Sequence, residues 1–387
     1  MTRQLRHSSF GIGAILLLIG SIVSVLGCTP KAPDSEAENE PMSPMPGREP
    51  VATPESAEAP SRSTEDQGER LQQTMRYQAM GTDFEFTLYS EPGAESTAEI
   101  VRIADMAMEA VRELEEQISQ WKPRSQTTYL NRHAAKEPVK VSYEVFTLLQ
   151  TCKQLYRDTN GAFDITVGPL IELWGFYKGK GHFPSKEELR TAVTQVGLDK
   201  VSLNEDERTV SFSHEDMHLD FGGIGKGLAL DVAAEVIRNY GVSSGILHAG
   251  TSTVLAIGTP PGEAKWTVRI RNPYNTNEYV DEVFLEDESL STSASYEKWF
   301  EIDGKKYCHI FDPRSGLPVE GMVSATAIVP SGTVSDALST AFFVMGVKET
   351  QKYCSRHPDV RAILVPDTGG EPEPRRIGFS MRREERS

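Results

Sequence analysis

Residues 220–227 are Asp220-Phe221-Gly222-Gly223-Ile224-Gly225-Lys226-Gly227, directly before a predicted helix that ends at Tyr240-Gly241. A glycine-rich loop before a helix presents backbone N–H groups to a phosphate, and Lys226 adds a positive charge. A Walker A loop needs Gly at position 220 and Ser or Thr at 227, where Asp and Gly stand. The dinucleotide spacing Gly-x-Gly-x-x-Gly also fails, since Gly227 follows Gly225 one residue too early. The stretch excludes the two commonest nucleotide-binding folds; a phosphate contact and a plain glycine turn both stay open.

The elements around this stretch predict an α+β fold, because helices and strands do not alternate regularly. Helices are expected behind a capping box at Ser96–Glu99, around Val145–Leu155 up to Asn160-Gly161, behind a second capping box at Ser185–Glu188, and after Gly227. Strands are expected around Phe84–Leu88, Val210, Ile246–Ile257, Trp266–Ile270, Val283–Leu285, Trp299–Ile302 and Ser324–Val329.

The N-terminus has the pattern of an export signal. Arg3 and Arg6 precede an uncharged run from Phe10 to Leu26, which is short for a spanning helix and suits a signal-peptide core. The run ends in Val25-Leu26-Gly27-Cys28, which resembles a bacterial lipobox. That resemblance implies that residues 1–27 are removed and that Cys28 is lipidated. An uncleaved membrane anchor stays the alternative.

Composition divides the rest of the chain. Residues 28–70 hold eight prolines and ten acidic against four basic residues, which predicts a disordered, extended tether. Residues 71–368 are expected to form one folded domain, and residues 369–387 a solvated tail. The formal net charge of −16 argues against nucleic-acid binding.

Three further segments carry side chains suited to chemistry. Asp164, in the stretch 161–169, offers an acceptor to a flat ligand, although a glycine-stopped helix explains the same residues. His309, before the turn Asp312–Gly316, is a candidate general base or a structural histidine. Ser335 is a predicted N-cap, which places Asp336 and Thr340 on one face of the following helix. Their oxygens suit magnesium, but an acidic first turn also balances a helix dipole.

In their order along the chain, these segments resemble the ApbE-type FAD:protein FMN transferases, which are often exported lipoproteins. The resemblance runs from about Tyr77 to Ala341. It is carried by Ala79-Met80-Gly81-Thr82, Ile118-Ser119 with Trp121, Leu130-Asn131, 161–169, Leu173-Trp174-Gly175-Phe176, 220–227, Ser291-Thr292-Ser293, 309–316 and 336–340. It implies a single compact, T-fold-like mixed domain.

The resemblance also implies roles for individual residues. Those that would line the flavin are Met80, Trp121, Ala162, Phe163 and Asp164. Those that would contact FAD elsewhere are Lys226, Ala229 and Ile310. Magnesium would be held by the carbonyl of Gly225 and the side chains of Asp336 and Thr340, and His309 would assist catalysis.

The implied reaction moves FMN from FAD onto a Thr or Ser hydroxyl of a target protein and releases AMP. The implied acceptors are membrane-associated redox subunits of the Nqr or Rnf type. The lipid on Cys28 would hold the domain at the periplasmic face of a bacterial membrane. Two alternatives stay open: an FAD pyrophosphatase in which water replaces the protein hydroxyl, and a flavin-binding or solute-binding lipoprotein without turnover.

Overall fold

The computed structural model describes residues 70–94 and 96–379. The expected signal peptide, the expected lipidation site Cys28 and all but the last residue of the expected tether lie outside the described residues. Within the described part of the chain, no helix is both long and apolar enough to cross a membrane.

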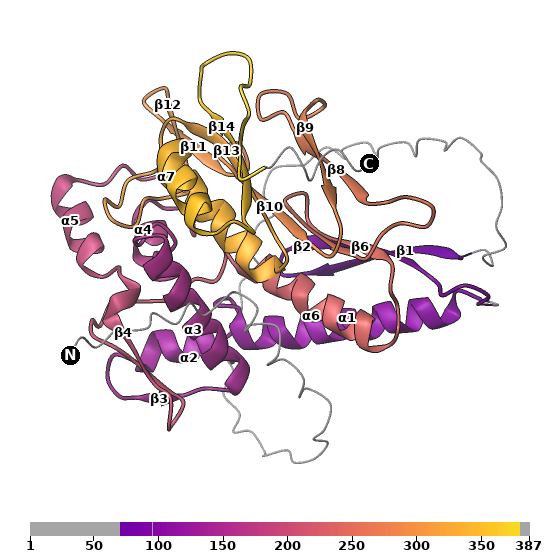
Figure 1. The fold of residues 1–387 in the computed structure, drawn as a ribbon. Coiled ribbons are helices and arrows are strands. Elements are labelled where there is room, and N and C mark those ends of the chain that lie inside the picture. Colours follow the sequence, from indigo (N-terminus) through magenta and orange to yellow (C-terminus); the bar gives the residue numbers. More distant parts are fainter. Residues whose placement is uncertain (1–69, 95, 380–387) are drawn as a thin grey trace, which may run out of the picture. The chain divides into compact units, whose positions relative to one another are not determined.

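Helices and strands are mixed along the chain (Figure 1). The helices are α1 (Ala98–Ile118), α2 (Gln126–His133), α3 (Tyr143–Asp158), α4 (Gly168–Leu173), α5 (Lys186–Thr194), the short 3₁₀ turn η2 (Leu198–Lys200), α6 (Gly225–Asn239) and α7 (Gly332–Arg356). The strands are β1 (Gln72–Ala79), β2 (Thr82–Tyr89), β3 (Val139–Lys140), β4 (Val201–Asn204), β5 (Thr209–Phe212), β6 (Gly245–Ala249), β7 (Thr253–Ile257), β8 (Trp266–Arg271), β9 (Tyr279–Leu285), β10 (Ser289–Ala294), β11 (Trp299–Ile302), β12 (Lys305–Cys308), β13 (Met322–Val329), β14 (Arg361–Pro366) and β15 (Arg375–Ile377). This confirms the α+β class.

An antiparallel sheet of eight strands forms the centre, in the order β1-β2-β6-β7-β10-β13-β14-β15. Strand β7 is buried on both faces. Leu255 and Ile257 join the main core with residues of α1, α6 and α7, whereas Val254 and Ala256 join a second core with the β8–β9 hairpin. Because side chains of a strand alternate between faces, the helices cover one face of the sheet and the hairpin covers the other.

The hydrophobic periodicity predicted α1 and α3 correctly. The expected apolar face of α1 is buried from Ile100 to Ile118, and α3 ends before Asn160 and Gly161, both at positive φ. The capping box of α5 is present, but the one expected for α1 is not: Thr97 is the N-cap and its side chain makes no capping bond.

Two further expectations are corrected. Ser331, not Ser335, caps α7 by accepting a hydrogen bond from the Val334 backbone, so Ser335 lies inside the helix. Part of the expected solvated tail forms β15, which pairs with β14 and buries Ile377. Three residues are too few for an alternating pattern to reveal a strand whose partner lies in another segment.

Candidate active site

The glycine-rich stretch forms a turn that leads into α6, which begins at Gly225. Asp220 shapes this turn through both carboxylate oxygens. Its Oδ1 accepts from the Gly222 backbone (2.7 Å), and its Oδ2 accepts from Gln120 Nε2 and from the Tyr177 hydroxyl, both at 2.6 Å. Asp220 stands where a Walker A loop would have its first glycine. It fixes the turn through one hydrogen bond to Gly222 and two to Gln120 and Tyr177.

Helices α6 and α7 touch backbone to backbone at Gly227 and Gly332. A Cβ placed on Gly227 would lie 1.9 Å from the Gly332 carbonyl oxygen, so only glycine permits this approach. The half-buried carboxylate of Asp231 in α6 joins the two helices. Its Oδ1 accepts from the Gly332 backbone, and its Oδ2 accepts from the Ser331 hydroxyl and from the backbone and hydroxyl of Thr333. These four bonds place the first turn of α7 against α6.

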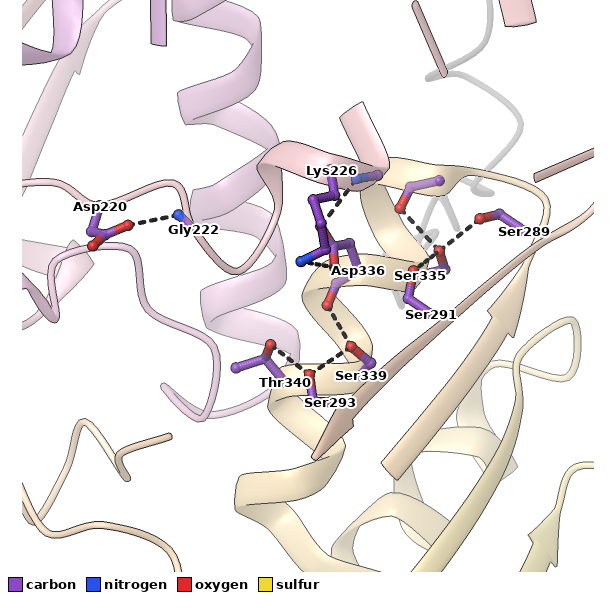
Figure 2. Close-up of polar contacts among 12 residues, drawn as sticks. Asp220, Gly222, Lys226, Ser289, Ser291, Ser293, Ser335, Asp336, Ser339 and Thr340 are labelled. Carbon is purple, nitrogen blue, oxygen red and sulfur yellow. Dashed lines mark hydrogen bonds and ion pairs between the residues drawn. The ribbon is translucent and has the colours of Figure 1, made fainter. Parts of the chain in front are cut away.

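This crossing brings Asp336 to the start of α6, as Figure 2 shows. The buried Asp336 accepts a hydrogen bond at Oδ2 from the Gly227 backbone (3.0 Å), and its Oδ1 lies 3.9 Å from Lys226 Nζ. Asp336 thus caps one helix from another, and the N-terminal end of α6 favours its negative charge.

Thr340 lies one turn beyond Asp336 and near the loop. The nearest neighbour of a Cβ built on Gly223 would be Thr340 Oγ1, at 3.4 Å, followed by Phe163 at 3.8 Å. Gly225, which the resemblance had implied as a carbonyl ligand, is buried as the first residue of α6. Gly223 of the loop thus also approaches Thr340, which the sequence reasoning did not single out, and the Gly225 carbonyl as a metal ligand stays a prediction.

The oxygens gathered here suit a hard divalent cation. Among the described residues, no three His, Cys, Asp or Glu side chains come together as a metal site. A cation at this place would thus depend on Asp336 with hydroxyl and carbonyl oxygens, which is the donor chemistry that magnesium accepts. The fit rests on the donor types of Asp336 and Thr340 and on Asp336 Oδ1, which lies 3.9 Å from Lys226 Nζ.

His309 follows the β11–β12 hairpin and is anchored by the main chain of Lys298. Its backbone N–H donates to the Lys298 carbonyl (3.1 Å), and its Nδ1 lies 3.2 Å from the same oxygen. Because a carbonyl only accepts, Nδ1 carries the proton and Nε2 is left as the basic nitrogen. Burial lowers the pKa of His309 to about 4. The hydrogen bond to Lys298 opposes this shift, and the charges of Lys298 and Lys226 add to it. The imidazole is therefore neutral near pH 7.

Asp164 accepts hydrogen bonds from its own loop and from η2 through both carboxylate oxygens. Its Oδ1 accepts from the Thr166 backbone (2.8 Å) and hydroxyl (2.6 Å), and its Oδ2 accepts from the Leu198 backbone (3.2 Å). Burial raises its pKa to about 6, against the lowering effect of these bonds. The carboxylate thus holds its own loop to η2, and its expected contact with a flavin stays a prediction.

The other expected flavin residues lie in contrasting environments. Met80 has a positive φ in the β1–β2 turn, and its backbone N–H donates to Glu115 Oε2 (3.0 Å). The Trp121 ring is exposed and meets Tyr177 edge to face, with centroids 5.2 Å apart. The buried residues are Ala162, Phe163, Ala229 and Ile310. A fully buried Ala229 has no side-chain surface to offer FAD.

Several residues of the site carry no local sequence signal. These residues act through partners in other segments, so neither periodicity nor a short motif distinguishes them: Gln120, Tyr177, Glu115 and Lys298. All three described cysteines are free and buried; they are Cys152, Cys308 and Cys354. Because none is paired, no disulfide constrains the site among these residues.

Comparison with known proteins places the chain in one family. The ApbE family model matches residues 80–364. The FAD:protein FMN transferase of Vibrio cholerae is 30% identical over 271 residues, which cover 69% of this chain and 79% of that one. The one of Klebsiella pneumoniae is 28% identical over 291 residues, with 74% and 86% covered.

Solved structures share the fold as well. The ApbE protein of Thermotoga maritima superposes with a TM-score of 0.71 at 30% identity and covers 79% of this chain and 97% of its own. The flavinyl transferase ApbE of Pseudomonas stutzeri, in its apo form, gives 0.70 at 26% identity, with 80% and 95% covered. The likeness spans almost the whole of both solved chains.

Proposed function

The chain belongs to the ApbE family, and we propose that it is an FAD:protein FMN transferase that moves FMN from FAD onto a hydroxyl of a target protein. One observation carries the proposal: Asp336, Thr340 and Lys226 meet at the glycine loop that opens α6. Carboxylate, hydroxyl, ammonium and helix N-terminus together suit a diphosphate with its cation.

The proposed step is a phosphoryl-type transfer. The oxygen of a Thr or Ser hydroxyl attacks the FMN phosphorus of FAD, a new phosphoester bond forms, and the bond to the AMP phosphate breaks. His309 Nε2 takes the hydroxyl proton, for which its neutral state is required. Lys298 supports this role by holding Nδ1 through its carbonyl, so that Nε2 remains the basic nitrogen.

We propose Asp336 and Thr340 as side-chain magnesium ligands, with a backbone carbonyl of the glycine loop. When bound, magnesium neutralises clustered phosphate charge and stabilises the leaving oxygen. A cation is needed because the diphosphate adds clustered negative charge to a chain whose net charge is already −16. Lys226 and the backbone N–H groups at the start of α6 would bind the phosphate oxygens directly.

On the flavin side, we propose that the exposed Trp121 ring stacks on the isoalloxazine and that Met80 lines the pocket. Tyr177 supports Trp121 edge to face and ties it, through Asp220, to the phosphate-binding turn. A flavin stacked on Trp121 would therefore be coupled to the loop that receives its phosphate.

The deciding experiment incubates the purified protein with FAD, magnesium and candidate acceptor subunits of the Nqr or Rnf type. Transfer gives a fluorescent flavin on the denatured acceptor band, with AMP released in equal amount. AMP and soluble FMN without a labelled acceptor would instead establish a pyrophosphatase. FAD binding with neither product would establish a flavin-binding protein and reject the proposed reaction.

We propose that the protein is exported and anchored to a bacterial membrane through Cys28, with the catalytic domain outside the cytoplasm. Cys28→Ala is expected to move the protein from the membrane fraction to the soluble fraction. Its transfer rate to a soluble acceptor should not change, because Cys28 lies outside the described domain. Membrane retention of the variant would instead support an uncleaved anchor.

A further inference from the structure

A chain of hydroxyl groups leads from the interior of α7 to Thr340. Ser339 Oγ donates to the Asp336 carbonyl (2.8 Å), Ser293 Oγ of β10 lies 2.9 Å from Ser339 Oγ, and Thr340 Oγ1 lies 3.1 Å from Ser293 Oγ. Figure 2 shows Ser293 between the two residues of α7. The chain therefore runs from a carbonyl that only accepts to a proposed metal ligand.

The Asp336 carbonyl determines which way each hydroxyl proton in this series of hydrogen bonds points. Each hydroxyl has one proton, and that of Ser339 is used on the Asp336 carbonyl. Ser339 Oγ can then only accept from Ser293, which uses the single proton of Ser293. Ser293 Oγ in turn accepts from Thr340, whose proton points toward β10. The remaining lone pairs of Thr340 Oγ1 are then available to a cation.

We propose that Ser293 is a positioning residue that makes Thr340 an acceptor-only ligand at the cation site; this rests on the proposed function. A hydroxyl whose proton points toward a cation repels that cation. A Thr340 proton fixed toward Ser293 therefore strengthens cation binding, without any contact between Ser293 and the metal. Ser293 acts through Thr340, and Ser339 acts through Ser293.

Strand β10 carries a second serine, Ser291, whose hydroxyl contacts α7 without leading to the proposed cation site. Ser291 Oγ lies 2.8 Å from Ser335 Oγ, and Ser335 donates to the Gly332 carbonyl (3.0 Å). Like Ser293, Ser291 links β10 to α7 through one hydroxyl, but its partner in α7 is Ser335 and not Thr340. Ser291→Ala therefore controls for the loss of a strand-to-helix hydrogen bond.

The test measures metal binding directly, with Mn²⁺ as the probe and electron paramagnetic resonance of the unbound ion as the readout, in the presence of FAD. Ser293→Ala is expected to raise the Mn²⁺ Kd by about fivefold, the equivalent of one net hydrogen bond. Ser339→Ala should weaken binding in the same direction, because Ser339 is connected to Thr340 through Ser293. Ser293→Thr keeps the hydroxyl and should restore the wild-type Kd, and Ser291→Ala should match the wild type.

If the wild-type protein binds Mn²⁺, two results would overturn the role of Ser293 and leave the proposed cation site standing. One is equal Kd values for Ser293→Ala and Ser291→Ala, and the other is a wild-type Kd in Ser339→Ala. Circular dichroism spectra of the variants establish that they are folded. If the wild-type protein itself binds no Mn²⁺ with FAD present, the proposed cation site fails, and the inference fails with it.

Discussion

At the scale of single residues, Asp336 divides its carboxylate between two tasks. One oxygen accepts from the Gly227 backbone at the start of α6, and the other faces Lys226. An amide in place of the carboxylate keeps the cap but loses the charge, because an Asn side-chain oxygen also accepts from a helix N-terminus. The two tasks can therefore be separated by mutation.

We expect Asp336→Asn to abolish magnesium-dependent transfer while lowering the free energy of unfolding little. Asp336→Ala should lose transfer as well and, in addition, lose about 1 kcal/mol of stability through the missing cap. Urea unfolding and an AMP-release assay at several magnesium concentrations check both. Full activity in Asp336→Asn would contradict the assignment of this carboxylate to the cation.

His309 gives the site a defined pH behaviour. Its pKa in the folded protein is about 4, below the ordinary value of 6.5, because burial disfavours the charged imidazole. Between pH 4 and pH 6.5, roughly, the unfolded chain binds a proton at His309 and the folded chain does not. The free energy of unfolding linked to neutral His309 is therefore complete above about pH 6.5 and is lost as the pH falls toward about 4.

His309 should accordingly remain a neutral base down to about pH 5. The plot of transfer rate against pH should therefore show no inflection from His309 near pH 6.5. A titration of the imidazole ¹⁵N signals, with His309→Gln to identify the resonance, checks the protonation state. A His309 titration near pH 6.5 would contradict the neutral base. His309→Gln should also slow transfer much more than it weakens FAD binding.

At the scale of elements, the contact of α6 with α7 sets the distance between the loop and Asp336. The approach at Gly227 and Gly332 leaves no room for a side chain, and the four bonds to Asp231 hold the first turn of α7 in place. Side chains of α7 that lie beyond this turn are thereby placed against the start of α6. The crossing is thus a condition for the site.

Gly227→Ala should separate the helices and lower the free energy of unfolding by about 3 kcal/mol, through overpacking against the Gly332 carbonyl. Gly225→Ala is the matched control, since a Cβ there would meet only Ile118 Cδ1, at 3.8 Å. Its free energy of unfolding should stay within about 1 kcal/mol of the wild type. Equal stabilities for the two variants would show that the helices do not cross this closely.

At the scale of the whole folded unit, the C-terminal segment completes the sheet. Strand β15 pairs with β14, Ile377 is buried, and Arg376 Nε donates to Asp281 Oδ2 of β9 (2.9 Å). Arg361 of β14, paired with Glu288, also lies over the ring of Phe379. This segment belongs to the fold and is not an appendage to it.

A variant that ends at Gly370 should therefore be about 2 kcal/mol less stable than one that ends at Phe379, because it loses the strand pairing and the burial of Ile377. Thermal unfolding of the two truncated proteins measures the difference. Identical melting temperatures would contradict this role and support the solvated tail that the composition predicts.

The sequence by itself determined the α+β class, the apolar faces of α1 and α3, the glycine loop and the family. These properties are local or are read in order along one chain. A helix face repeats within one turn, a glycine loop lies beside the helix it opens, and a set of motifs in order distinguishes a family. Asp336, Thr340 and His309 could thus be singled out without coordinates.

Only the tertiary structure decided how these groups are used. Gly227 and Asp336 are 109 residues apart, and Ser293 and Thr340 are 47 apart, so no local pattern shows that they meet. The same limit applies to Asp164, whose carboxylate is occupied by Thr166 and Leu198. Which lone pairs remain open to a ligand depends on hydrogen-bond partners brought together by packing, and packing is a property of the folded chain as a whole.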